Sequence, residues 1–177
     1  AYLGGRVYGY VVEHDGEEIW ETTLQTARQA MSEAEAGNDA EIVAIGIANQ
    51  RETTLTWNRD TGEVIGKAIV WQDRRTSGMC EQLKASGREA EVNQKTGLTI
   101  DPYFSGTKLK WILENRPEAA ELAAQGKLAF GTIDSFLIYR LTGMEKHLTD
   151  ETNASRPMLY NIKTQEWDDG LLAKLGN

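Results

Sequence analysis

An apolar run at residues 41–48 constrains the fold of this chain more than any other feature. Its apolar residues occupy both faces of a strand, with Val43, Ile45 and Ile47 on one face and Ile42, Ala44 and Gly46 on the other. A strand that is apolar on both faces is typical of a sheet that helices cover above and below. The run therefore predicts an α/β domain with a buried central strand.

The remaining segments alternate between strand and helix patterns. Apolar spacing predicts a helix from Asp15, its candidate N-cap, to a stop at Gly37. Residues 53–57 and 64–71 predict a hairpin, because Asn, Asp and Gly lie between them. Residues 1–12 predict a strand or an irregular lead-in. Beyond Arg75 the predicted helices are 76–85, 88–95, 105–115, 118–125, 134–141 and the start of another at 171–175, with a short strand at 128–132.

Composition excludes several classes of partner. The formal net charge of −8 over 177 residues argues against binding to nucleic acid or to an anionic membrane. The single cysteine, Cys80, leaves no disulfide within the chain, which suits a reducing cytosol. No apolar run approaches the roughly 18 residues of a membrane span, and the N-terminus lacks a signal-peptide pattern. We therefore expect a cytoplasmic protein.

The common motifs for phosphate, metal and nucleophilic sites are missing. Neither G-x-x-x-x-G-K-[ST] nor G-x-G-x-x-G occurs. One cysteine and two well-separated histidines, His14 and His147, give no zinc spacing and too few partners for a Ser-His-Asp or Cys-His site. We therefore predict no metal site and assign no catalytic residue.

A polar joint, Asn49 to Glu52, follows the apolar run. Ligands of open α/β sheets bind beyond the carboxyl ends of strands. Arg51 offers a rigid fork of donors and Glu52 offers acceptors, so together they can hold a hydroxyl that both donates and accepts a hydrogen bond. That pairing suits a polyol better than a phosphate. The alternative is a solvated hairpin corner with a weak ion pair, and composition alone favours this alternative.

Two aromatic residues are further candidates. Trp71 ends the apolar strand at 68–71, where its ring could pack on the carbon skeleton of a sugar or polyol. Tyr103 lies in a turn before a helix, where its phenol could bond a ligand. The alternatives are a core or rim tryptophan, one of five in the chain, and a tyrosine that only packs against the helix.

Several long motifs, in the same order, resemble the signatures of the glycerol kinase branch of the FGGY-type sugar and polyol kinases. They are V-E-H-D (12–15) with E-I-W (18–20), N-Q-R-E-T-T (49–54), A-I-V-W-Q-D-R-R-T (68–76), T-G-L-T-I-D-P-Y-F-S-G-T-K (96–108), G-T-I-D-S-F-L-I-Y-R-L-T-G (131–143) and T-D-E-T-N-A-S-R-P-M-L-Y-N-I (149–162). The two motifs that contain N-Q-R-E-T and D-P-Y-F-S-G-T-K point to glycerol kinases in particular.

The resemblance implies an N-terminal domain of the actin-like, ribonuclease-H-like ATPase fold, with a mixed sheet flanked by helices. It also implies transfer of the γ-phosphoryl group of ATP to glycerol, with Mg²⁺, to give glycerol 3-phosphate. By motif, Arg51 and Glu52 would bind glycerol hydroxyls, Tyr103 would add a hydrogen bond and Trp71 would pack along the carbon chain. This reverses the preference for a solvated corner. The resemblance leaves Asn49, Gln50 and Asp73 as supporting residues, and Asp134 and Asp150 as caps or braces of local turns.

The chain departs from the family pattern in two places. No Asp-x-Gly-Thr hairpin precedes Val12, and the family's second domain, which supplies the catalytic base, is not in these residues. We therefore expect residues 1–177 to be a partial N-terminal domain that binds neither ATP nor Mg²⁺ tightly and is inactive alone. The alternatives are a kinase for another polyol or sugar, and a non-catalytic truncated module that self-associates through an exposed strand edge.

Overall fold

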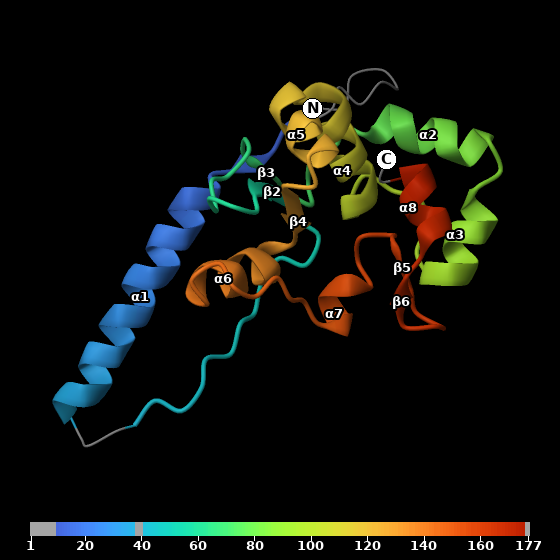
Figure 1. Cartoon of the computed structure of the whole chain (residues 1–177). Helices are drawn as coiled ribbons and strands as arrows, with labels where there is room; N and C mark the ends of the chain where they lie inside the picture. The colour runs from blue at the N-terminus through green and yellow to red at the C-terminus, as the bar shows by residue number, and fades with distance from the viewer. Residues whose placement is uncertain (1–9, 38–40, 176–177) are drawn as a thin grey trace.

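The computed structural model describes residues 10–37 and 41–175, and Figure 1 traces them as a helix-rich body with one long projecting helix. The helices are α1 (Gly16–Gly37), α2 (Ser77–Ala85), α3 (Glu89–Thr96), α4 (Ser105–Asn115), α5 (Pro117–Ala124), α6 (Ile133–Leu141), α7 (Glu151–Ala154) and α8 (Asp169–Leu175). The strands are β1 (Glu13–His14), β2 (Leu55–Asn58), β3 (Ala68–Ile69), β4 (Leu128–Gly131), β5 (Tyr160–Asn161) and β6 (Glu166–Trp167). None of the helices in these ranges is both long and apolar enough to span a membrane.

Four short strands form the centre of the body. β1 pairs with β3 and β2 pairs with β4, both antiparallel. An antiparallel bridge between Thr54 and Ile69 joins the two pairs, with backbone hydrogen bonds of 2.9 Å in each direction. A second bridge, Trp57 to Val64, completes the predicted hairpin, although its second strand is regular only at Ala68–Ile69. The order is therefore β1, β3, β2 and β4.

Helices cover both faces of these strands, as the sequence predicts for an α/β domain. On one face Ile65 and Ile69 pack with Ile112 and Ala119 of α4 and α5. On the other face Leu55 and Trp57 of β2 belong to a buried cluster that includes Phe136 and Tyr139 of α6. A third cluster lies among α2, α3, α4 and α8 and the segment at 158–159. Figure 1 shows α4 and α5 on one side of the strands and α6 on the other.

The helix predicted after Asp15 is confirmed as α1. The carboxylate of Asp15 accepts hydrogen bonds from the backbone N–H groups of Glu17 (2.9 Å) and Glu18 (3.3 Å), which is the expected N-cap. The first turns are anchored to the body: Trp20 packs against the β2–α6 cluster and Glu17 pairs with Arg140 of α6. The helix then extends away from the body in Figure 1.

The prediction of a doubly buried strand at residues 41–48 is wrong. The segment has no regular structure, and no strand pairs with it within residues 10–37 and 41–175. Val43 is 86% exposed and Ile45 is 66% exposed. The physical reason is that an apolar pattern specifies what a segment can bury, whereas a strand also needs neighbours to pair its backbone N–H and C=O groups. The predicted lead-in at 1–12 lies mostly outside the described residues, and its last residues precede β1.

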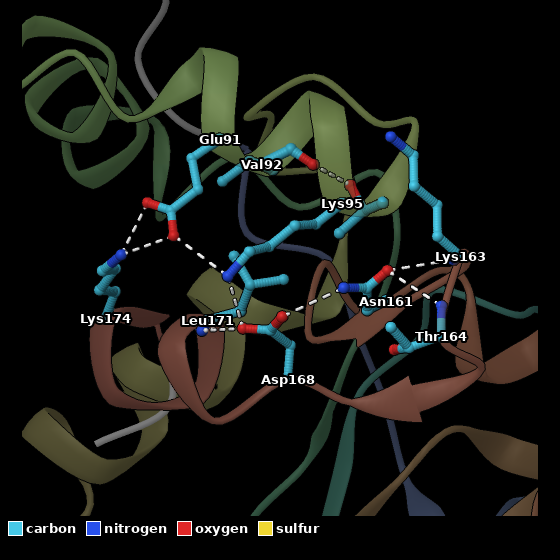
Figure 2. Close-up of polar contacts among 10 residues, drawn as sticks. Glu91, Val92, Lys95, Asn161, Lys163, Thr164, Asp168, Leu171 and Lys174 are labelled. Carbon is cyan, nitrogen blue, oxygen red and sulfur yellow. Dashed lines mark hydrogen bonds and ion pairs between the residues drawn. The ribbon is translucent and has the colours of Figure 1, made fainter.

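The C-terminal elements are held together by a charged network, which Figure 2 shows in close-up. Lys95 of α3 bonds Glu91 at 3.2 Å and Asp168, just before α8, at 2.8 Å. Lys174 of α8 bonds Glu91 at 2.6 Å, and Asp168 accepts a 3.3 Å hydrogen bond from Asn161 of β5. The network therefore joins α3, α8 and the β5–β6 hairpin. The helix segment predicted at 171–175 corresponds to the last residues of α8, whereas neither α7 nor this hairpin was predicted from the sequence.

Candidate functional site

The polar joint folds as a tight turn that separates Arg51 from Glu52. The backbone N–H of Thr53 donates to the carbonyl of Gln50 at 3.3 Å, and the Thr53 hydroxyl donates to the Gln50 side chain at 2.8 Å. Glu52 is only 5% exposed, whereas Arg51 is exposed. The two neighbours therefore differ in environment, with the carboxylate inside and the guanidinium at the surface.

Glu52 is held at both its backbone and its side chain. Its carbonyl oxygen accepts hydrogen bonds from the Lys108 ammonium (2.8 Å) and the Ser105 hydroxyl (3.2 Å) of α4. Its carboxylate Oε1 accepts a 2.7 Å charged hydrogen bond from Nε of Arg156. The second carboxylate oxygen has no hydrogen-bond partner among the described residues and is not sealed from solvent. Glu52 can therefore accept a hydrogen bond from a ligand.

The two aromatic candidates lie next to each other. The rings of Trp71 and Tyr103 have centroids 5.5 Å apart at an interplanar angle of 55°. Trp71 is 37% exposed, so part of its ring surface is accessible to a ligand. The Arg156 guanidinium carbon lies 5.9 Å from the Tyr103 ring centroid and 4.9 Å from that of Phe104. An aromatic wall, a carboxylate and a guanidinium thus meet in one region.

The structure groups three of the four predicted residues, namely Glu52, Trp71 and Tyr103. Glu52 and Tyr103 are linked through Lys108, which donates to the carbonyl oxygens of both, at 2.8 and 2.6 Å. Arg51 adjoins Glu52 in the chain, but its guanidinium makes no hydrogen bond or ion pair with the rest of the described chain. It is therefore available to a ligand without being positioned by this chain.

Asp73 braces the region, as predicted for a supporting residue. Its carboxylate accepts hydrogen bonds from the backbone N–H of Val12 (2.7 Å) and from the guanidinium of Arg75 (2.8 and 2.9 Å). Arg75 also bonds Glu13 of β1 and lies 4.6 Å from the centroid of Trp111. Burial raises the pKa of Asp73, but the hydrogen bonds from Arg75 and Val12 outweigh it and lower the pKa below its ordinary value.

The other polar candidates form a second network away from these aromatics. Asn49 donates to Asn153 (3.0 Å) and Asp134 (3.3 Å), and Thr149 donates to Asp134 at 2.7 Å. Asp150 is the N-cap of α7 and accepts from the backbone N–H of Asn153 at 2.8 Å. The roles predicted for Asp134 and Asp150, as brace and cap, are therefore confirmed.

A cavity of about 540 Å³ lies between β4, α6 and α7 rather than at the aromatic pair. Its wall includes Phe130, Thr132, Ser135, His147 and Asn153, and none of the four predicted site residues contributes to it. Its size alone does not make it the ligand site. The Glu52 region is the better candidate, because there an accessible aromatic face adjoins a charged acceptor with a free oxygen.

Two residues of the region were missed by sequence reasoning. Arg156 belongs to the quoted motif at 149–162, which carried no assigned role for it, and its contact with Glu52 spans 104 positions. Lys108 follows Gly-Thr in a segment interpreted only as a helix start. It is 0% exposed, and burial lowers its pKa to about 7. Both residues belong to quoted motifs, Arg156 to 149–162 and Lys108 to 96–108, and this membership is the signal that could have identified them.

Among the residues that the structure describes, none is a clear ligand for a nucleotide or a metal. Within residues 10–37 and 41–175 no cluster of His, Cys, Asp and Glu could hold a metal ion. The sequence has no glycine-rich phosphate loop. We therefore assign none of the described residues to the phosphates of ATP or to Mg²⁺.

Comparison with known proteins agrees with the resemblance in the motifs. Glycerol kinase 1 of Pseudomonas aeruginosa is 59% identical over 162 residues, which cover 92% of this chain and 33% of that protein. A glycerol kinase of Agrobacterium fabrum is 56% identical over 165 residues, covering 93% of this chain and 33% of that protein. The chain thus spans about a third of the length of these relatives.

Solved structures show the same fold. The crystal structure of Plasmodium falciparum glycerol kinase with ADP superposes with a TM-score of 0.90 at 33% identity, over 93% of this chain and 33% of that one. A ligand-bound xylulose kinase from Lactobacillus acidophilus gives a TM-score of 0.80 at 25% identity, over 98% of this chain and 33% of that one. The expected sugar-kinase fold is therefore confirmed. Residues 8–177 match a family model, and the chain belongs to the FGGY family of carbohydrate kinases as its N-terminal domain.

Proposed function

We propose that this chain is the acceptor-binding part of an ATP-dependent glycerol kinase, which transfers the γ-phosphoryl group of ATP to glycerol and yields glycerol 3-phosphate and ADP. One observation carries the proposal. Glu52, Trp71 and Tyr103 meet in one region of a chain that is 59% identical to a glycerol kinase over 162 residues.

Each residue has a separate role toward glycerol. The free carboxylate oxygen of Glu52 accepts a hydrogen bond from one hydroxyl, and Arg51 donates to another. The phenol of Tyr103 adds a hydrogen bond, and the exposed part of Trp71 packs along the carbon chain. Arg156 fixes the orientation of the Glu52 carboxylate through the 2.7 Å bond to Oε1. These groups bind and orient the acceptor, which is the larger part of catalysis in phosphoryl transfer.

The proposal assigns no step of the chemistry to this chain. ATP supplies the phosphoryl group when it is bound, and Mg²⁺ would neutralise its phosphates. The base toward the attacking hydroxyl and the donor site would lie in parts of the protein outside these residues. The 177-residue chain on its own is therefore expected to lack kinase activity.

The test is an acceptor profile of the full-length protein that contains this chain. An assay that couples ADP release to NADH oxidation would compare glycerol with xylulose, gluconate and ribitol. We expect the highest kcat/KM for glycerol. A higher value for one of the other acceptors would replace glycerol kinase with the alternative, a kinase for another sugar or polyol, which the fold shared with a xylulose kinase leaves open.

A further inference from the structure

Lys108 is an unusual residue for its position. It lies on α4 with 0% of its surface exposed, and it forms no salt bridge within the described residues. A buried ammonium is costly unless it is hydrogen-bonded, and lysine is almost never fully buried without a partner. Its partners here are two backbone carbonyl oxygens, so Lys108 stabilises backbone geometry rather than a carboxylate.

The two carbonyls belong to two residues of the candidate site. Nζ of Lys108 lies 2.8 Å from the carbonyl oxygen of Glu52 and 2.6 Å from that of Tyr103. The Ser105 hydroxyl donates to the same Glu52 carbonyl at 3.2 Å. Glu52 and Tyr103 are far apart in sequence, so this single ammonium fixes the separation of the two backbones from which their side chains project.

The same helix also approaches the segment that carries Arg156. A Cβ atom at Gly106 would lie 2.6 Å from the backbone oxygen of Pro157, so only glycine allows α4 to pack this closely. Arg156, the residue before Pro157, bonds the Glu52 carboxylate. The first turn of α4 therefore holds three parts of the site in register: Glu52, Tyr103 and the segment of Arg156.

We propose that Lys108 is a positioning residue for the acceptor, which sets the distance between Glu52 and Tyr103 and thereby the affinity for glycerol. This inference rests on the proposed function. It adds a residue that does not touch glycerol but acts through the two residues that do.

The protonation state of Lys108 does not weaken this role. Burial lowers its pKa to about 7, so charged and neutral amine coexist near neutral pH. The charged form has three N–H donors, and the neutral amine still has two. Either form can serve the two carbonyls, which explains how the contact persists in a buried site.

The test is steady-state kinetics of Lys108→Met in the full-length protein. Methionine fills the space with an unbranched apolar side chain but donates to neither carbonyl. We expect the glycerol KM to rise about 10- to 100-fold, because small displacements of binding groups cost that much, while kcat at saturating glycerol falls by less than about threefold. Lys110→Met on the same helix is the matched control, since Lys110 pairs with Glu114 at 3.1 Å and, among the described residues, makes no hydrogen bond or ion pair with Glu52 or Tyr103. It should leave both constants unchanged.

A purely structural Lys108 gives a different result. Lys108→Met would then lower the thermal midpoint and the amount of active protein, but the glycerol KM of the folded fraction would equal that of wild type, and the proposal would be overturned. If the variant does not fold, Lys108→Gln is the second variant, because its side chain keeps N–H donors but is too short to reach both carbonyls. It should raise the glycerol KM by about two- to fivefold, and an unchanged KM would overturn the proposal.

Failure of the proposed function is a separate outcome. If the wild-type protein prefers another polyol or sugar, glycerol is the wrong acceptor, and the same comparison of KM values is made with the preferred one. A rise in that KM supports the positioning role of Lys108 although glycerol kinase activity is rejected. An unchanged KM rejects the role of Lys108 as well.

Discussion

Glu52→Gln is the substitution that most sharply separates the proposed glycerol site from a merely structural turn. Glutamine has nearly the same shape, and its side-chain oxygen can still accept the 2.7 Å bond from Arg156. What changes is the charge. A hydrogen bond that involves a charged group contributes roughly 1.5–3 kcal/mol, and about 1.4 kcal/mol corresponds to a tenfold change in affinity. Loss of the charged acceptor should therefore raise the glycerol KM about 10- to 100-fold.

The effect on stability should be smaller. The Arg156 side chain is 24% exposed and that of Glu52 is 6% exposed, so water stabilises much of the uncompensated guanidinium charge. We expect a loss of about 1–2 kcal/mol in the free energy of unfolding. Coupled-enzyme kinetics of the full-length protein and urea unfolding measure the two effects. The matched control is Glu63→Gln in the same hairpin, an exposed side chain. A variant with an unchanged glycerol KM would refute the role of Glu52.

Four further predictions follow from other parts of the structure. Trp71→Ala should raise the glycerol KM about two- to tenfold with little effect on the free energy of unfolding, because its partly exposed ring supplies an apolar wall. Steady-state kinetics and urea unfolding measure the two effects, and a large loss in the free energy of unfolding would contradict this prediction. The free energy of unfolding should rise between about pH 7 and pH 10.5, because folded Lys108 releases its proton near pH 7 whereas the unfolded residue holds it up to its ordinary pKa of 10.5. Urea unfolding should show a steeper rise with pH for wild type than for Lys108→Met, and equal slopes would count against the lowered pKa. High salt, about 1 M, should lower the thermal midpoint of wild type more than that of Lys95→Met, because Lys95 joins a partly exposed charge network that salt screens. Equal shifts would show that the network contributes nothing. The isolated 177-residue chain should self-associate through the exposed segment at 41–48. Light scattering should give a lower molar mass for the double variant Val43→Lys with Ile45→Lys than for wild type, and a monomeric wild type would contradict this prediction.

Apart from α7, the described helices could be predicted wholly or in part from the sequence, because their signals are local. Asp15 caps α1 through N–H groups two and three residues away. Gly97 ends α3 with φ of +72°, a conformation that favours glycine. Pro117 starts α5, where the missing N–H has no cost. Each of these endings depends on neighbours along the chain, so the sequence contains the information that determines it.

The irregular conformation of residues 41–48 and the inner contacts of the site could not be predicted in this way. Strand formation requires a partner strand, which the apolar pattern of the segment does not identify. Arg156 and Lys108 reach Glu52 across 104 and 56 positions, and neither contact leaves a local pattern. Glu52, Trp71 and Tyr103 were predicted because they are polar or aromatic residues at strand ends and turns, and because their motifs resemble those of a known family. Arg156 and Lys108, which hold them in place, also lie in such motifs, but nothing near them in the sequence indicates that they contact Glu52.

The most direct test of the account is a crystal structure of the full-length protein with glycerol bound. We predict a glycerol hydroxyl within about 2.6–3.2 Å of the free carboxylate oxygen of Glu52, a second hydroxyl at the phenol of Tyr103, and the carbon chain against the ring of Trp71. Glycerol bound instead in the cavity between β4, α6 and α7, with Glu52 untouched, would contradict the account.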